Sequence, residues 1–400
     1  MGPYVIEWLN LLIRLLHVVA AIAWIGASFY FIALDYSLRP PKDTRDSERG
    51  VGGETWEIHG GGFYRVEKFR VAPVALPERL SWFKWEAYIT WLSGFVLLVV
   101  VYYLNPHTYL IDPSVANLAA LPAIGISIGI LVVGWLVYEF LCRLLEGRDR
   151  LLALVLAAVV IGVVYGASQL FSGRAVYIQI GAMLGTWMVA NVFFVIIPGH
   201  WDLIRAKEAG QEPDPRPGLR GKQRSVHNNY LTLPAVFAML SNHFPMTYGH
   251  EYGWLILVAI MAILVWVRHF FNLRHQGRTV WAIPVVAAAA MVLLAIVIAP
   301  WGRTAGGDGA AEPPVAFATV QGIIEVRCQV CHSAHPTHEG FTAPPLGVAF
   351  DTAEQIQANA ARIEQMAVIT NAMPLGNVTG MTQEERDTLG AWIRQGAKRD

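Results

Sequence analysis

Long apolar runs recur along the first 300 residues of the chain and then stop. A helix that crosses a membrane needs about 20 mostly apolar residues to cover roughly 30 Å of hydrocarbon. The pattern predicts eight such helices, at residues 5–34, 85–104, 121–142, 151–171, 177–197, 228–243, 252–273 and 279–299. The sixth is the shortest and contains Pro234. We therefore expect an all-α protein whose residues 1–300 form a polytopic transmembrane bundle.

Basic residues are distributed unevenly between alternate loops. Loops 35–84, 143–150 and 198–227 and the segment 268–278 contain 21 Lys and Arg residues, whereas the intervening loops contain only Arg174. Cytoplasmic loops are the ones enriched in Lys and Arg. The distribution predicts a bacterial inner-membrane protein with both termini in the periplasm.

The last hundred residues have a different character. Residues 301–314 are rich in Gly, Ala and Pro without periodicity, which indicates a linker. Residues 315–400 are expected to form a small soluble domain with helices at 315–327, 352–371 and 383–397. The last two helices begin with a Thr followed three residues later by Gln or Glu, the spacing of a capping box. We expect this domain to be a periplasmic, class I-like cytochrome c, because it contains a haem-attachment motif.

Cys328, Cys331 and His332 form a C-x-x-C-H motif, the signature of covalent c-type haem attachment. The two thiols add to the haem vinyl groups, and the histidine presents its imidazole to the iron. A redox dithiol needs a βαβ context and a zinc site needs a second Cys pair, and the sequence has neither. We expect one haem c per chain. Haem is attached outside the cytoplasm, which agrees with the predicted orientation.

A methionine is the expected sixth iron ligand, because it raises the potential of a His-ligated haem. Met373 precedes Pro374 in a predicted loop, where the backbone is free to fold over the distal haem face. We therefore assign Met373 as the second axial ligand. The rival residues lie inside a predicted helix, beside a helix cap or close to the attachment site: Met366, Met381, His335 and His338.

Composition agrees with a membrane protein and narrows the function classes. Hydrophobic residues make up 54% of the chain and charged residues 15%, with a mean hydropathy of +0.42. Nucleic-acid binders show a basic excess or stripe, whereas the formal net charge here is zero. The chain is thus expected to contact membrane lipid and no nucleic acid.

Polar residues within predicted spans are candidates for function, because their burial in lipid is costly. His17 lies on a polar face of the first helix that also carries Arg14, three residues earlier. Two interpretations stay open: a stripe that hydrogen-bonds neighbouring helices, or a ligand to a b-type haem or substrate. His227 and His243 lie about 24 Å apart at the two ends of the sixth helix, too far to bind one metal.

The 35–84 loop is too long for a simple connector. Alternation after the triple glycine that follows His59 predicts a small hairpin or lid. Its basic residues either face solvent and lipid or hold a planar anion.

Several strings in the chain are distinctive: GGGFYRVEKFRVAP, LSWFKWEAYITWLSGF, NVFFVIIPGH, HNNYLTLPAVFAMLSNHFP, RHFFNLRH and CQVCH. With these strings the chain resembles the membrane-bound urate hydroxylases, also called urate oxidases, that end in a cytochrome c domain. The resemblance spans nearly the whole chain. It implies oxidation of urate to 5-hydroxyisourate by the membrane domain. Electrons then leave through the attached cytochrome c to a respiratory acceptor, such as another cytochrome c or a terminal oxidase.

Urate chemistry of this kind needs an anion clamp and a base. The candidates for the clamp are Arg65, Lys68, Arg70 and Lys84. The candidates for the base are His17, His59, Glu86 and His243. The alternative function is a membrane-anchored electron-transfer subunit, either an electron carrier or one that oxidises quinol. A transporter with a fused cytochrome is a third.

Distance sets a condition on any of these assignments. If urate binds at the inner loops, electrons must cross roughly 30 Å of hydrocarbon to reach the haem. Either a relay exists, such as a b-type haem on His17, or the substrate site faces outward near His243. The relay, or a site in the middle of the membrane, is the favoured interpretation.

Overall fold

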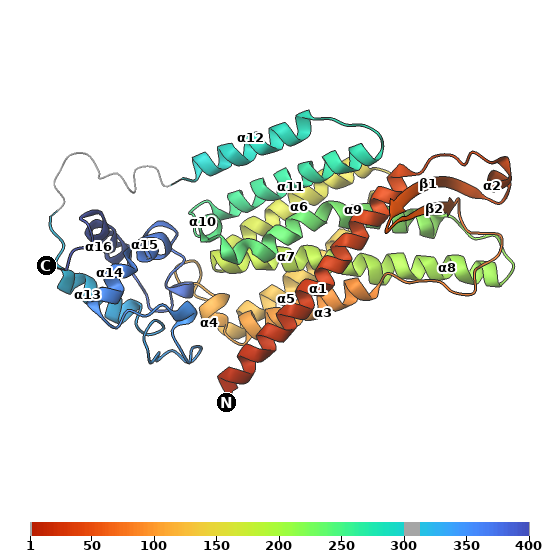
Figure 1. Cartoon of the computed structure of the whole chain (residues 1–400). Helices are drawn as coiled ribbons and strands as arrows, with labels where there is room; N and C mark the ends of the chain where they lie inside the picture. The colour runs from red at the N-terminus through yellow and green to blue at the C-terminus, as the bar shows by residue number, and fades with distance from the viewer. Residues whose placement is uncertain (1, 300–312, 400) are drawn as a thin grey trace.

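The computed structural model of the chain describes residues 2–299 and 313–399, so most of the predicted linker, residues 301–314, lies outside the described residues. A helical bundle makes up the first part. A smaller helical domain lies at one end of it, and a β-hairpin lies at the other end (Figure 1). We call these the docked end and the hairpin end of the bundle.

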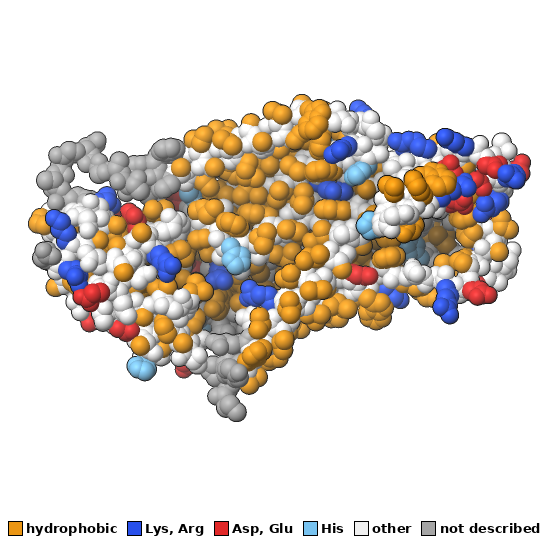
Figure 2. Space-filling view, viewed as in Figure 1, with side chains coloured by type: hydrophobic (Ala, Val, Ile, Leu, Met, Phe, Trp, Pro, Cys, Tyr) orange, Lys and Arg blue, Asp and Glu red, His pale blue; other side chains and the backbone are white. Residues whose placement is uncertain are grey.

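Helices occur at all eight predicted positions. They are α1 (Gly2–Ser37), α3 (Trp85–Leu98), α5 (Ala120–Leu144), α6 (Asp149–Ser168), α7 (Gly173–Ala190) with α8 (Ile197–Glu208), α9 (Arg216–Leu240), α11 (Gly253–His275) and α12 (Ala282–Val297). Among the described residues, six helices are long and apolar enough to cross a membrane. Figure 2 shows a broad hydrophobic surface over this bundle, as expected of helices that face lipid.

Two of the eight expected spans fall short of that criterion. Helix α9 begins at Arg216, twelve residues before the predicted start, because a polar amphipathic segment continues the helix where hydropathy alone indicates a loop. Pro234 lies inside α9 and does not end it. Helix α12 is apolar but only 16 residues long. The start predicted for the sixth span, residue 228, was wrong, because α9 begins at Arg216.

Helix α7 is the central element of the bundle. It contacts α3, α5, α6, α9 and α11, and its buried side chains include Tyr177, Met183 and Trp187. Gly181 allows α9 to come close, since a Cβ there would lie 2.6 Å from the Cβ of Ala238. Small residues at such a contact are typical of membrane helix packing. Two π-helical turns, Val99–Tyr103 and Asn191–Ile196, extend α3 and α7.

The predicted hairpin is present, so the all-α expectation needs one exception. Strands β1 (Val51–His59) and β2 (Gly62–Phe69) pair antiparallel, next to the short helix α2 (Thr44–Glu48). The two-residue turn uses Gly60 and Gly61, both with positive φ, which tight hairpins require.

The C-terminal domain contains α13 (Phe317–Arg327), α14 (Ala353–Ala358), α15 (Ala360–Ile363) and α16 (Gln383–Arg394). Both predicted capping boxes are present, at Thr352 and Thr382. The helix expected over 352–371 is instead broken into α14, α15 and a π-helical turn, Glu364–Ile369. Its core includes Ile324, Leu389 and Trp392.

Two glycines allow this domain to rest on the docked end. A Cβ on Gly376 would lie 2.8–3.0 Å from the carbonyl oxygens of His107, Thr108 and Ile111, at helix α4 (Pro106–Tyr109). A Cβ on Gly249, just after α10 (Pro245–Tyr248), would overlap the Thr370 carbonyl. The two backbones therefore touch without intervening side chains.

We predict that Gly376→Ala loosens this contact, because the new methyl group meets backbone atoms that have little freedom to move. Hydrogen exchange should rise in segments 106–111 and 371–377. Gly60→Ala is the matched control, since Gly60 has nearly the same φ (+56° against +55°) and open space around it. Equal exchange at segment 106–111 in both variants would contradict the close contact.

Candidate functional site

The C-x-x-C-H segment follows directly from the last turn of α13. The amide of Cys328 donates to Ile324 O, and the amides of Cys331 and His332 both donate to Cys328 O. These bonds wind the motif into a tight turn, and the two thiols are not joined in a disulfide. Burial raises the pKa of the Cys328 thiol to about 12 and also raises that of Cys331. A redox dithiol needs a thiol with a lowered pKa instead, so the environment disfavours that alternative.

His332 is held by its own backbone surroundings. Its Nδ1 lies 2.9 Å from the carbonyl oxygen of Val348, and its ring packs 5.2 Å from that of Phe350. The Val348 carbonyl directly follows the short 3-10 turn Pro345–Gly347. A histidine that donates from Nδ1 to a carbonyl keeps Nε2 for a metal. The donor set fits a haem iron.

Met373 lies in the loop between the last π-helical turn and α16. Its amide donates to Met366 O, and its carbonyl accepts a 2.7 Å hydrogen bond from Arg386 Nη1. Both bonds fix the backbone of this loop. Of the rival ligands, Met381 is buried in the core of the domain and His335 is exposed.

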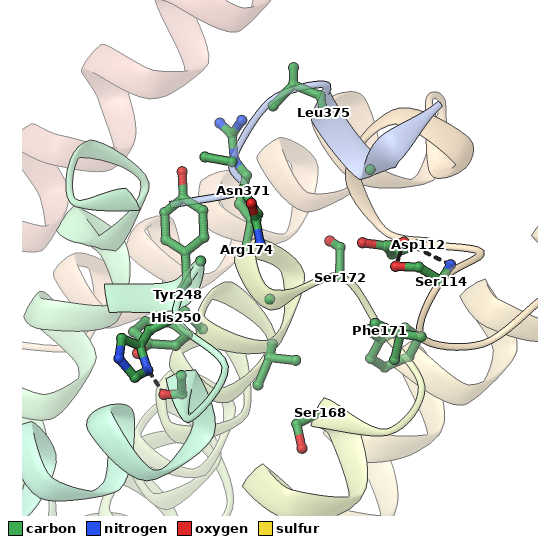
Figure 3. Close-up of a pocket in the computed structure, with 18 of the residues that line it drawn as sticks. Asp112, Ser114, Ser168, Phe171, Ser172, Arg174, Tyr248, His250, Asn371 and Leu375 are labelled. Carbon is green, nitrogen blue, oxygen red and sulfur yellow. Dashed lines mark hydrogen bonds between the residues drawn. The ribbon is translucent and has the colours of Figure 1, made fainter. Parts of the chain in front are cut away.

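A cavity of about 440 Å³ lies where this loop meets the docked end. Ala372 and Pro374, the two neighbours of Met373, line it together with residues from α4, α7 and α10. Figure 3 shows Asn371 and Leu375 on one side of the cavity and Ser168 and Phe171 on the opposite side. The cavity is therefore enclosed jointly by the bundle and the C-terminal domain.

Arg174 is the basic residue of this cavity. Its Nε donates to Asn242 Oδ1 (2.9 Å), and its guanidinium lies 5.1 Å from the ring centre of Tyr109. Asn242 in turn donates to Tyr102 (3.4 Å). Burial raises the pKa of Tyr109 and Tyr248, which the positive charge of Arg174 partly opposes. Both tyrosines thus stay neutral beside a fixed cation.

His17 is engaged between helices. Its Nδ1 lies 2.9 Å from Thr90 O, and its Nε2 lies 3.2 Å from Met239 Sδ. Gly94 leaves the space that the imidazole fills, since a Cβ there would lie 2.8 Å from it. In this arrangement Met239 Sδ occupies the position at Nε2 where an iron would bind, which fits a histidine that contacts neighbouring helices.

The other sequence candidates do not come together in one site. His59 is exposed at the hairpin turn, whereas His243 is exposed in the turn Ser241–His243 at the docked end. Lys84 lies over the rings of Trp82 and Trp85. One buried oxygen of Glu86 has no hydrogen-bond partner in the part of the chain that the structure describes.

Two of the four proposed clamp residues, Arg65 and Lys68, form ion pairs at the hairpin end. Lys68 forms an ion pair with Asp35, which also binds Lys222 at 2.7 Å. Arg65 forms ion pairs with Asp46 and Glu54. As placed, Arg65 faces two carboxylates, whereas Lys68 and Lys222 share the single carboxylate of Asp35.

A buried polar cluster near the hairpin end was missed from the sequence. It consists of Tyr138, Glu139, Asn191, Arg224 and His227. Tyr138 OH lies 2.8 Å from His227 Nδ1 and accepts from Asn191 at 2.9 Å, while Arg224 donates to Glu139 at 2.8 Å. The missing signal was the true start of α9: once the helix includes residue 224, its polar side chains face inward.

Several buried atoms of this cluster have no hydrogen-bond partner among the described residues: Arg224 Nε and Nη1, Asn191 Oδ1 and, in contact with Tyr138, Trp187 Nε1. Buried polar atoms without partners are costly. A helix that keeps them inside a membrane is a candidate for function as well as for structure.

Residues 3–299 match the sequence profile of a protein family described as urate oxidase N-terminal. The chain belongs to this family. No curated protein and no solved structure matches the chain.

Membership of the urate oxidase N-terminal family supports a urate-related oxidoreductase activity. The matched range covers the whole helical bundle and the hairpin, and it ends before the C-terminal domain. The polar cluster and Arg174 both lie within the family's part of the chain, whereas the C-x-x-C-H motif lies outside it.

We predict that Glu139→Gln destabilises the protein more than Arg143→Gln does. Glu139 binds two cations, the buried Arg224 and the exposed Arg143. Arg224 is 5% exposed and Arg143 is 77% exposed. Glu139→Gln leaves Arg224 buried without a counter-charge and should cost about 3–5 kcal/mol. Arg143→Gln removes an exposed pair and should cost less than about 1 kcal/mol. Thermal unfolding in one detergent measures both, and equal midpoints would refute the difference.

Proposed function

We propose that the chain is a membrane-bound enzyme that oxidises urate to 5-hydroxyisourate and passes the electrons to a c-type haem in its own C-terminal domain. One observation carries this proposal. A bundle of the urate oxidase N-terminal family shares a cavity with the loop that bears Met373, in a domain with a C-x-x-C-H motif.

Four residues of this chain would hold the haem. Cys328 and Cys331 would form the thioether bonds, and His332 and Met373 would be the axial ligands. When bound, the haem would supply one-electron redox chemistry. The hydrogen bond to Val348 O orients the ring of His332, and the Arg386 bond to the Met373 carbonyl holds the distal loop.

The reaction balances without oxygen as a reactant. Urate and one water molecule yield 5-hydroxyisourate, two protons and two electrons. Since the chain would hold one haem, the two electrons leave one at a time to an external one-electron acceptor, such as a respiratory cytochrome c or terminal oxidase. The protein must bind the purine, exclude bulk water from it and place it close to the haem domain.

The location proposed for the enzyme is the bacterial inner membrane. Within the described part of the chain, six helices are long and apolar enough to span it. Of the two ends, the hairpin end is surrounded by most of the basic loop residues, which favours the cytoplasmic side for it. The docked end, the C-terminal domain and both termini would then be periplasmic, where c-type haem is attached.

The alternative is a membrane-anchored electron-transfer subunit that oxidises quinol and does no urate chemistry. The two functions differ in the reductant that the haem accepts.

We predict that urate, mixed anaerobically with the purified full chain, reduces the c-type haem. Wild-type protein should develop the absorption bands of ferrous haem with urate and not with quinol. His332→Ala removes an axial ligand and should abolish urate-driven reduction. Reduction by quinol alone would favour the electron-transfer subunit, and reduction by neither would refute the enzyme.

A pyridine haemochrome spectrum tests the cofactor content separately. Because Met239 Sδ lies 3.2 Å from Nε2 of His17, where an iron would have to bind, we expect c-type haem only, at one per chain. A second, b-type component would instead support an electron relay through a b-type haem bound by His17.

A further inference from the structure

We propose that the cavity at the docked end binds the anionic purine substrate, with Arg174 as the cation that holds it. The inference rests on the proposed function and places its substrate site on the same side of the bundle as the C-terminal domain. It differs from the expectation of a relay or a site in the middle of the membrane.

Charge is the first argument. Arg174 is the single Lys or Arg of the three loops at the docked end, and the carboxylates of Asp112 and Glu251 also line the cavity. Arg174 is held in place by Asn242 and by the face of Tyr109, so little side-chain freedom remains to be lost when an anion binds. A guanidinium is planar and matches planar acceptors well. Arg65 and Lys68 at the hairpin end instead form ion pairs with carboxylates.

Size and lining are the second argument. Ligand cavities for small molecules measure about 300–1,000 Å³ and combine apolar walls with a few polar groups. This cavity measures about 440 Å³. Aromatic side chains line it, and they suit the flat faces of a bicyclic ring: Tyr109, Phe171, Tyr248 and Trp254. Ser172 and His250 add polar groups.

Position is the third argument. The cavity is lined by Ala372 and Pro374, the residues on either side of Met373. A purine bound there would be separated from the haem domain by one loop. No electron would have to cross the hydrocarbon layer, and no second redox centre would be needed. A substrate site at the inner loops would require electrons to cross roughly 30 Å of hydrocarbon, and a site in this cavity would not.

Binding of urate to the intact holoprotein tests the assignment without turnover. With the haem kept reduced under anaerobic conditions, urate cannot be oxidised, and equilibrium dialysis gives its dissociation constant. Arg174→Gln removes a charged hydrogen bond and should weaken binding about 10- to 100-fold. Arg150→Gln, exposed in the first turn of α6 at the hairpin end, is the matched control and should bind like the wild type.

A second variant fills the cavity without removing any charge. Val115 lines the cavity and is 42% exposed, so Val115→Trp occupies the space at its rim. It should also weaken urate binding while the ferrous haem spectrum is unchanged.

The assignment requires both variants to weaken binding. If either Arg174→Gln or Val115→Trp binds urate like the wild type, the cavity is not the substrate site. In that case urate-driven haem reduction in the wild type would still support the proposed function. If wild-type protein neither binds urate nor is reduced by it, both the function and the site are wrong.

Discussion

The backbone contact between the C-terminal domain and the bundle is the constraint on which the rest of the account depends. Gly249 and Gly376 each bring a chain segment against carbonyl oxygens of the other part, at distances that no side chain tolerates. Because the loop between Thr370 and Gly376 is held at both ends, Met373 has a defined place beside the bundle. The cavity with Arg174 exists only through this contact, since both parts supply its walls.

The two ends of the bundle use their charges differently. At the hairpin end, Arg65, Lys68 and the buried Arg224 form ion pairs with carboxylates. These pairs tie loops and helices together. At the docked end, Arg174 is bound by neutral groups, an amide and aromatic rings. A cation that has no carboxylate partner among the described residues, in a cavity next to the proposed haem domain, suits an anion that is to be oxidised.

Much of the fold follows from local patterns, and the site follows from contacts that such patterns do not contain. Apolar runs predicted the helix positions, and the Thr-x-x-Gln and Thr-x-x-Glu spacings predicted the caps at Thr352 and Thr382. The start of α9 was missed because its first turns are polar. Lys68 was a clamp candidate because Asp35, its partner, lies 33 residues away in the chain. Arg174 did stand out as the lone Lys or Arg of the outer loops, but its cavity depends on a domain contact between distant glycines.

The most direct test of the account is whether electrons pass from substrate to haem within one molecule. At saturating urate under anaerobic conditions, the rate constant for haem reduction is measured over a wide range of protein concentration. The account predicts a rate constant that does not depend on protein concentration, because cavity and haem domain belong to the same chain. A rate constant that rises in proportion to protein concentration would show transfer between separate molecules and would contradict it.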